Sequence, residues 1–524
     1  MKGLTKFAIL AGACVLATAG AAASSPPPLM DLNQRTAEQR EKGAAAMALA
    51  EGVDHSAILK DKKAAQALLK KAEALASGGA AEDPLGRNAL DYIRVPALIA
   101  LDRHDEALAV ARALVVRAPS VPPFYHYSFP LSARTAPREL ASFVDLARQR
   151  VRREDLGTVR GMLEVDDAFL ALRTLSLAKD EASRARLAQS LLDFAWPLRD
   201  DPSAQDSLRK IVLNAKLKAG DAAGARALAQ ELVTVEALAP MVVASRYSVL
   251  LDASAADVRL RRLLDGQDAR TRRLVEAAPE DMSPLVERAQ FFRMTGRPDE
   301  ALKLLQPHIT DMAKVKQGGQ RAFWAVNEAA FALDDLGRSG EGIALMDRLL
   351  ALGVDEHSDL INMAINRLEL FNSAGRYEEG AREAAKLDRQ AKGLASDYGF
   401  MWIWSSAACA QSAAGKPAAA APWLEKLAAK SSENPAAHTR ALLCANDIEG
   451  AGKTIVARLS EDDPSSTLMA LQEFEPGPHP GSALQRQLVE RLASVKARPE
   501  VAAAIGKTGR ILRLPFTRSY WGDF

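Results

Sequence analysis

The sequence predicts an all-α fold built as a stack of antiparallel helix pairs. Alanine is used heavily across the 524 residues, and aromatic residues make up only 5% of them. That composition favours tightly packed helices and argues against an all-β protein. A helix-turn-helix hinge also recurs along the chain, as a stack of helix pairs requires. The formal net charge is only +2, so no charge excess recruits nucleic acid or an acidic membrane surface.

The best-formed hinge runs from Gly296 to Leu302, between two segments whose apolar residues recur at helical spacing. Gly296 is suited to end the first helix because glycine adopts a positive φ at little cost. Pro298 and Asp299 suit the first turn of the next helix, where a missing N–H is harmless and a negative charge meets the positive end of the helix dipole.

Comparable hinges recur along most of the chain. We assign them to Asp102, Gly220, Gly296, Gly337, Gly375, Gly415 and Asp447. From Gly296 to Gly415 the hinges follow one another at nearly even steps. The residue five positions after each hinge is small, and these residues are Ala107, Ala225, Ala301, Gly342, Gly380, Ala420 and Gly452. Small residues at a fixed register allow the backbones of two helices to approach closely.

This pattern resembles the tetratricopeptide-repeat (TPR) family, in which antiparallel helix pairs repeat with a period of about 34 residues. The family keeps a small residue at that register, and it favours an aromatic residue four before the hinge. Phe292 and Phe371 match the aromatic position, whereas Leu333 and Gln411 do not. The steps from Gly296 to Gly415 are longer than the family's period and suggest lengthened helices, so "TPR-like" is the appropriate term. The resemblance implies a right-handed α-solenoid with an extended concave surface.

The N-terminus is typical of a secretory signal peptide over residues 1–23. Lys2 and Lys6 precede an apolar stretch, and Ala21-Ala22-Ala23 offers a cleavage site. A membrane anchor and a lipoprotein modified at Cys14 are the alternatives. Cleavage would remove two of the 68 Lys and Arg residues, leaving 66 against 66 Asp and Glu. No later stretch is apolar for long enough to span a membrane. We therefore expect a periplasmic or secreted protein, with outer-membrane association left open.

The rest of the chain divides into four segments. Residues 24–35 form a flexible proline-rich lead-in, residues 36–240 form N-terminal helical repeats, and residues 241–497 form C-terminal TPR-like repeats. Residues 498–524 form a tail of strand-like composition, which either caps the last helix pair or docks on a partner. The prolines and aromatics of residues 120–130 exclude a regular helix there.

Motifs for catalysis or cofactor binding are incomplete, so we predict a non-catalytic protein without a cofactor or metal. Gly450-Ala451-Gly452-Lys453-Thr454 imitates a phosphate-binding loop but lacks its first glycine and falls on a repeat hinge. Ser176-Leu177-Ala178-Lys179 with Lys507-Thr508-Gly509 imitates two elements of penicillin-recognising serine enzymes, but the third element is absent. The histidines show no tight metal-ligand spacing.

Aromatic clusters are the candidate partner-binding residues: Trp402, Trp404, Trp324, Phe124, Tyr125, Tyr127 and Trp521. Core packing is the alternative for each tryptophan cluster, and a loop folded onto the solenoid is the alternative for residues 124–127. Trp402 and Trp404 diverge by about 200° around a helix, so one of them should line a groove or a seam between units.

Cys409 and Cys444 are separated by 35 positions, close to one repeat period, so they could face each other on neighbouring helices. An oxidising compartment would permit a disulfide between them, and two buried free cysteines are the alternative.

The expected function is a periplasmic scaffold that binds a protein or peptide partner in envelope assembly or transport. The alternative is a helical-array enzyme or binding protein that acts on cell-wall glycan, because paired carboxylates cannot be located from sequence spacing alone.

Overall fold

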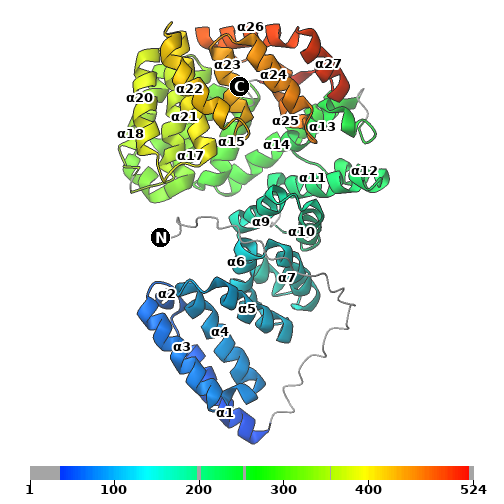
Figure 1. The fold of residues 1–524 in the computed structure, drawn as a ribbon, viewed down its shortest axis with the longest axis vertical. Helices are drawn as coiled ribbons and strands as arrows, with labels where there is room; N and C mark the ends of the chain where they lie inside the picture. Colours follow the sequence, from blue (N-terminus) through cyan, green and yellow to red (C-terminus); the bar gives the residue numbers. More distant parts are fainter. Residues whose placement is uncertain (1–35, 197–201, 252–254, 355, 518–524) are drawn as a thin grey trace. The chain divides into compact units, whose positions relative to one another are not determined.

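The computed structural model describes residues 36–196, 202–251, 255–354 and 356–517. The signal sequence, the lead-in and Trp521 therefore lie outside the described residues. Within the described ranges the chain is almost wholly helical, which confirms the predicted all-α class of stacked antiparallel helix pairs (Figure 1). The chain separates into two compact units, Met1–Lys179 and Asp180–Phe524. The predicted boundary between the two repeat segments, after residue 240, stays a prediction.

The first unit is a series of helices that pack against their neighbours in the chain. Its helices are α1 (Ala37–Glu51), α2 (His55–Ile58), α3 (Lys62–Ser77), α4 (Pro84–Ala100), α5 (His104–Arg117), α6 (Tyr125–Thr135), α7 (Pro137–Arg150), α8 (Leu156–Arg160) and α9 (Val165–Leu177), with the short 3-10 turns η2 (Ala80–Glu82) and η3 (Pro122–Phe124). The helix α4 contacts α1, α3 and α5, and its apolar face buries Leu90 and Ile93 in the core. Asp83 caps its N-terminus by accepting a hydrogen bond from the Gly86 N–H.

The second unit carries the regular repeats. Its helices are α10 (Glu181–Asp193), α11 (Pro202–Lys218), α12 (Ala222–Gln230), α13 (Val235–Val243), α14 (Ala256–Ala277), α15 (Met282–Met294), α16 (Pro298–Ile309), α17 (Met312–Asp335), α18 (Ser339–Leu350), α19 (Leu360–Ser373), α20 (Tyr377–Gln390), α21 (Asp397–Ala413), α22 (Pro417–Ala429), α23 (Pro435–Cys444), α24 (Ile448–Leu459), α25 (Ser465–Ala470), α26 (Ala483–Lys496) and α27 (Pro499–Thr508), with the 3-10 turn η4 (Ser245–Tyr247). Two short strands, β1 (Glu473–Glu475) and β2 (Arg513–Thr517), complete the described part of this unit.

The hinges have the backbone conformation that the sequence predicts. The hinge residues Gly220, Gly296, Gly337, Gly375 and Gly415 have φ values between 70° and 81°. Non-glycine hinges occur at Asp102, Lys179 and Asn446, with φ values of 56–60°. The last of these corrects the predicted register, because the hinge is Asn446 and not Asp447. The small residue five positions later is therefore Ala451, not Gly452, and Ala451 is fully buried.

The proline-rich segment 120–130 differs from its prediction, because α6 begins at Tyr125 and continues through Pro130. Pro122 and Pro123 lie in the preceding 3-10 turn η3, where their missing N–H groups cost little. Around Pro130 the side-chain hydroxyls of Ser128 and Ser132 donate to carbonyls of the preceding turn, at 2.7 Å each. Pro130 lies inside α6, so the helix accommodates a proline that the sequence predicts to be incompatible with it.

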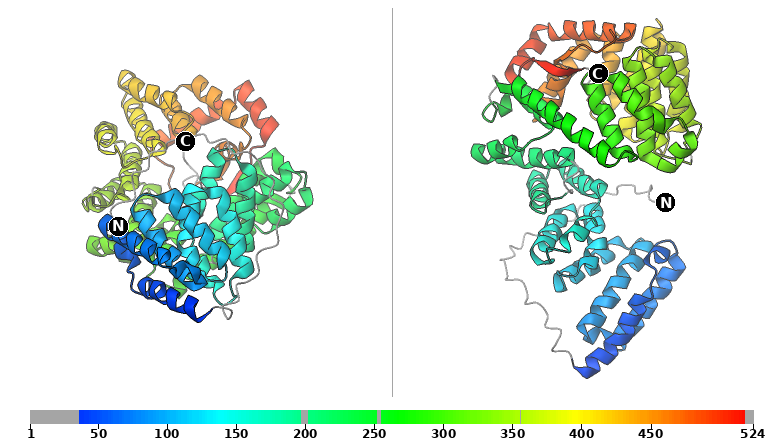
Figure 2. Two further views of the ribbon diagram at one scale, coloured as in Figure 1. Left: turned by 60° about the horizontal axis from the view of Figure 1, so that its bottom comes forward. Right: turned by 180° about the vertical axis from the view of Figure 1, so that it is seen from behind.

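The C-terminal segment closes the second unit on itself. The strand β1 pairs in parallel with β2, and Glu473 is in register with Arg513. Figure 2 shows β2, in red, among helices drawn in green and orange. Arg510 donates two guanidinium hydrogen bonds to the Val242 carbonyl, and Thr517 Oγ1 donates to the Arg293 carbonyl at 3.0 Å. The described part of the tail therefore contains a helix and a strand, and it joins the end of the array to α13, α14 and α15.

The two incomplete motifs fall on helices and on the residues that follow them. Gly450 to Thr454 lie inside α24, with Asp447 capping its N-terminus, so their N–H groups do not form a phosphate-binding loop. Lys179 is a hinge residue after α9 and does not share a helix face with Ser176. Lys507 and Thr508 end α27, and Gly509 follows them.

Candidate functional site

A polar cleft in the second unit is built from two repeated register positions. Positions six and three before each hinge lie one helical turn apart, so they face the same direction on their helix. On α15, α17, α19 and α23 these positions supply cleft-lining residues, which are Arg293, Phe331, Asp334, Glu369, Arg440 and Leu443. The repeat thus places side chains of different chemistry in one row along the inner helices.

The opposite wall of the cleft comes from residues outside the repeats. The segment from Gln472 to Gly481 and one face of α26 complete it, and the enclosed volume is about 680 Å³. Arg491 on α26 donates to the carbonyls of Leu443 and Cys444 at 2.8 Å each, which holds that helix over α23. A volume of this size is typical of a ligand pocket.

At one end of the cleft a buried ion-pair network surrounds Arg293. Its guanidinium lies 2.8 Å from a Glu328 carboxylate oxygen and 2.7 Å from one of Asp335. The three side chains are only 8%, 7% and 9% exposed, in that order. Gln290 also donates to Glu328 at 3.2 Å. Burial alone would lower the pKa of Arg293, but the two carboxylates hold it above its usual range. Burial raises the pKa of Asp335 above its usual value, and the Arg293 guanidinium opposes that rise.

The adjacent carboxylates of the cleft are also bound by protein groups. Burial raises the pKa of Asp334 to about 6, even though the Ser339 hydroxyl donates to this carboxylate at 2.5 Å. Glu369 pairs with Arg440 from α23. Glu369 is therefore paired with arginine, whereas Asp334 is shifted toward the neutral form near pH 6.

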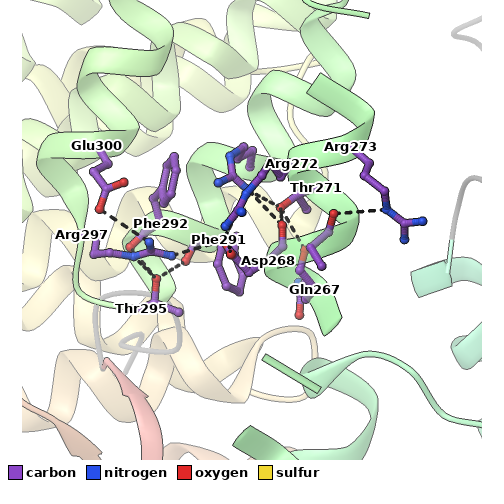
Figure 3. A network of polar contacts seen from close by, with 12 residues as sticks. Gln267, Asp268, Thr271, Arg272, Arg273, Phe291, Phe292, Thr295, Arg297 and Glu300 are labelled. Atoms are coloured by element: carbon purple, nitrogen blue, oxygen red, sulfur yellow. Dashed lines mark hydrogen bonds and ion pairs between the residues drawn. The ribbon is translucent and has the colours of Figure 1, made fainter. Parts of the chain in front are cut away.

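Exposed ion pairs follow three hinges of the second unit and the Asp102 hinge of the first unit. The residues one and four after the hinge pair as Arg103–Glu106, Arg297–Glu300, Arg338–Glu341 and Arg376–Glu379. Arg288 and Arg297 both stack on the Phe292 ring, at 4.5 and 4.7 Å from its centroid. Figure 3 shows this hinge, with Arg297 between Glu300 and the phenylalanine rings. Arg367, Phe371 and Arg376 repeat the same arrangement.

Trp402 and Trp404 pack between helices, and neither they nor Trp324 line the cleft. Trp404 Nε1 donates to Asp388 Oδ1 of α20 at 2.5 Å, and Lys426 of α22 lies 5.3 Å above its ring. Trp402 is half-buried and contacts Tyr398 edge to face. Trp324 is also half-buried against the core of the unit. Partner binding by these residues stays a prediction.

The aromatic residues of the first unit gather in a local cluster. Tyr125 is fully buried, and its hydroxyl donates to the Pro119 carbonyl at 2.8 Å. Tyr127 shares a 2.8 Å hydrogen bond with His55 Nδ1, and its ring lies near that of Tyr92. Phe124 contacts the Tyr92 ring at 5.7 Å. Burial raises the pKa of Tyr127 above its usual range. Tyr125 therefore packs as a core residue in this cluster.

Cys409 on α21 and Cys444 on α23 are joined by a disulfide, with a Cα–Cα distance of 4.9 Å. Cys409 occupies the register position six before its hinge, which on α17, α19 and α23 holds a cleft residue. The pair packs against Leu484 of α26. The bridge therefore ties the inner helices together directly beside the cleft wall.

The described residues contain neither a metal-ligand cluster nor a membrane-spanning helix. No group of three or more of their His, Cys, Asp or Glu side chains is arranged to hold a metal ion. No helix within the same ranges combines the length and apolarity needed to cross a membrane.

The sequence predicted aromatic clusters as the candidate site, and the cleft residues were not among them. A signal was present in the repeat register, because the position three before each hinge glycine from 296 to 415 is polar. Those residues are Arg293, Asp334, Asn372 and Ser412. A polar residue repeated on an otherwise apolar inner helix indicates a surface that is not simply core.

The fold and cleft together define an all-α, TPR-like array of helix pairs with a polar inner cleft. Similar solved structures include Naa15/Naa10 bound to HypK-THB, which is 15% identical over 86% of this chain and 74% of that chain, with a TM-score of 0.29. A Rap protein complexed with Competence and Sporulation Factor is 11% identical over 78% of this chain and 99% of that chain, with a TM-score of 0.28. No protein-family model and no curated protein matches the sequence. Similarity at this level does not transfer a function to this chain.

Proposed function

We propose that the protein is a non-catalytic scaffold of the cell envelope that binds a segment of a protein partner in the cleft of its second unit. The observation that carries this proposal is the composition of the cleft. Apolar groups such as Phe331 and Val489 line it together with charged groups, several of which are already paired inside the protein. Such a surface offers contact area and hydrogen bonds to a segment of a partner.

Export to the envelope is part of the same proposal. The sequence of residues 1–23 has the pattern of a signal peptide, and it lies outside the described residues. The disulfide between Cys409 and Cys444 supports an oxidising compartment, because cytosolic proteins rarely keep such bonds.

Site-specific photo-crosslinking in the envelope fraction of the source cells tests the proposal. A photoreactive phenylalanine analogue replaces Phe331 inside the cleft, and the matched control replaces Val258, which is 61% exposed and does not line the cleft. We expect one discrete adduct from position 331 that is absent from position 258. Val489→Asp, at a cleft-lining side chain that is 47% exposed, should abolish it without changing the circular dichroism spectrum. Identical adduct patterns at both positions, or no adduct at 331, would reject cleft binding.

Glycan cleavage remains the second candidate because of one observation. Asp334 lies in the cleft with its pKa raised to about 6, which suits a general acid, and Glu369 is a neighbouring carboxylate of the same cleft. Incubation of the purified protein with cell-wall glycan, followed by chromatography of released fragments, tests it. Release that Asp334→Asn abolishes would favour the enzyme, and no release from the wild-type protein would reject it.

A further inference from the structure

The cleft is closed on one side by a proline-rich segment, residues 476–481, which we name the strap. Its sequence is Pro476-Gly477-Pro478-His479-Pro480-Gly481, directly after β1. It forms no helix or strand, and residues 476–480 are exposed on their outer side while they line the cleft. Because the proline ring restricts φ to a narrow range, such a segment loses little entropy when it is held against a surface.

The strap rests on one hinge of the array. A Cβ atom added at Gly337 would lie 2.6 Å from His479 Nε2, so the histidine ring covers this hinge closely. At the equivalent hinges Gly375 and Gly415, no described heavy atom lies within 4 Å of such a Cβ. The φ values of the three glycines are 75°, 70° and 72°, so their backbones have the same shape. The C-terminal segment therefore covers two hinges of the series, Gly337 by His479 and Gly296 by Thr517 Cγ2 at 3.2 Å, and it leaves Gly375 and Gly415 open.

Basic side chains hold both ends of the segment. Arg513 pairs with Glu475 at 3.1 Å, just before the strap. Arg486 donates to the Gly481 carbonyl at 2.7 Å at its other end. Phe474, between Glu473 and Glu475, packs against Phe516 at 5.9 Å between ring centroids. The occupied surface therefore accepts an acidic and aromatic sequence followed by alternating prolines.

We propose that the strap occupies the place of a partner's segment, and that the partner presents an acidic, aromatic, proline-interrupted stretch like residues 473–481. This inference rests on the proposed function of the cleft and names the chemistry of its partner. Because both ends of the strap are tied to the fold, its effective concentration at the cleft is on the order of millimolar. A free segment of similar chemistry then binds only weakly until the strap is moved.

A fluorescent peptide with the sequence of residues 473–481 tests the inference by fluorescence anisotropy, with a scrambled peptide as the control probe. Two variants move the strap by different routes. One is the quadruple change Pro476→Gly, Pro478→Ser, His479→Gly and Pro480→Ser in the full chain. The other is Gly337→Ala, whose added methyl group collides with His479. Gly375→Ala is its matched control, with the same positive φ but open space around the new methyl group.

We expect the peptide to bind the quadruple variant at least tenfold more tightly than the wild-type protein. Gly337→Ala should also bind more tightly than Gly375→Ala, and the scrambled peptide should not bind. Equal affinity for all four proteins, equal binding of the scrambled peptide, or no binding to a quadruple variant with native circular dichroism would each overturn the inference. If the peptide fails while the crosslink at position 331 succeeds, only this inference is lost. Failure of both also rejects the proposed function.

Discussion

The repeats of the second unit carry two rows of ion pairs that use the same chemistry in different surroundings. The outer row, which follows each hinge, is exposed, as in Arg338–Glu341 with side chains 46% and 61% accessible. The inner row, which precedes the hinge, is buried, as in Arg293 between Glu328 and Asp335. An exposed pair adds little stability, whereas a buried network is costly to break because its remaining charges stay without water. The repeat therefore fixes where a charged residue stands relative to the hinge. Whether its ion pair contributes much or little to stability depends on how deeply it is buried.

The largest test removes the central cation of the inner row. Arg293→Met leaves Glu328 and Asp335 buried without their common partner, so we expect a loss of about 3–5 kcal/mol in the free energy of unfolding. The matched control, Arg338→Met in the outer row, should lose less than about 1 kcal/mol. Urea denaturation of both variants measures the contrast. Equal losses would show that the two rows do not differ in the way proposed.

The second test uses pH to separate the two rows. The carboxyl group of Asp334 has an ordinary pKa of 3.8 in the unfolded chain and a pKa of about 6 in the folded protein. Between these values the folded state keeps a proton that the unfolded state has released, so this group's contribution to stability falls as pH rises. The change amounts to up to about 3 kcal/mol between pH 4 and pH 7.

Asp334→Asn removes that titration while keeping an oxygen that accepts from Ser339. The variant should therefore gain stability relative to wild type as pH rises, by up to about 3 kcal/mol at pH 7. Urea denaturation at a series of pH values measures the difference. The outer-row variant Glu341→Gln serves as the control and should show no such rise, since the ion pair with Arg338 holds the Glu341 pKa below its usual value. Parallel profiles for wild type and Asp334→Asn would contradict the burial of this acid.

The smallest test concerns the close helix packing that supports both rows. A Cβ at Gly342 would lie 2.7 Å from the Ala330 carbonyl oxygen of α17, so Gly342→Ala should cost about 1–3 kcal/mol. Gly340 stands two positions earlier on the same helix, with no described atom within 4 Å of such a Cβ. Gly340→Ala should be neutral or stabilising by up to about 1 kcal/mol. Thermal unfolding measures the melting temperatures of the Gly342→Ala and Gly340→Ala variants. Equal melting temperatures would contradict the tight contact between α17 and α18.

Only part of the candidate site could be predicted from the sequence. The repeat register located the helices that form the cleft floor, and the polar residues three before the hinges were visible in it. The aromatic candidates were chosen by residue type alone, and Trp404 proved to bond Asp388 in a seam between α20, α21 and α22. The sequence could not predict that the strap lines the cleft, because nothing in residues 476–481 indicates which distant surface they contact.

The sequence by itself determined what depends on neighbouring residues. Helical periodicity, a positive φ at each hinge glycine and a small residue five positions later are local requirements, so they specify the helix pairs and their spacing. Tertiary structure alone decided which hinges are covered. His479 reaches Gly337, and Thr517 reaches the end of α15, from far along the chain in both cases. Such contacts depend on how many helix pairs stack between the two segments and on how the unit closes. No pattern of neighbouring residues specifies either.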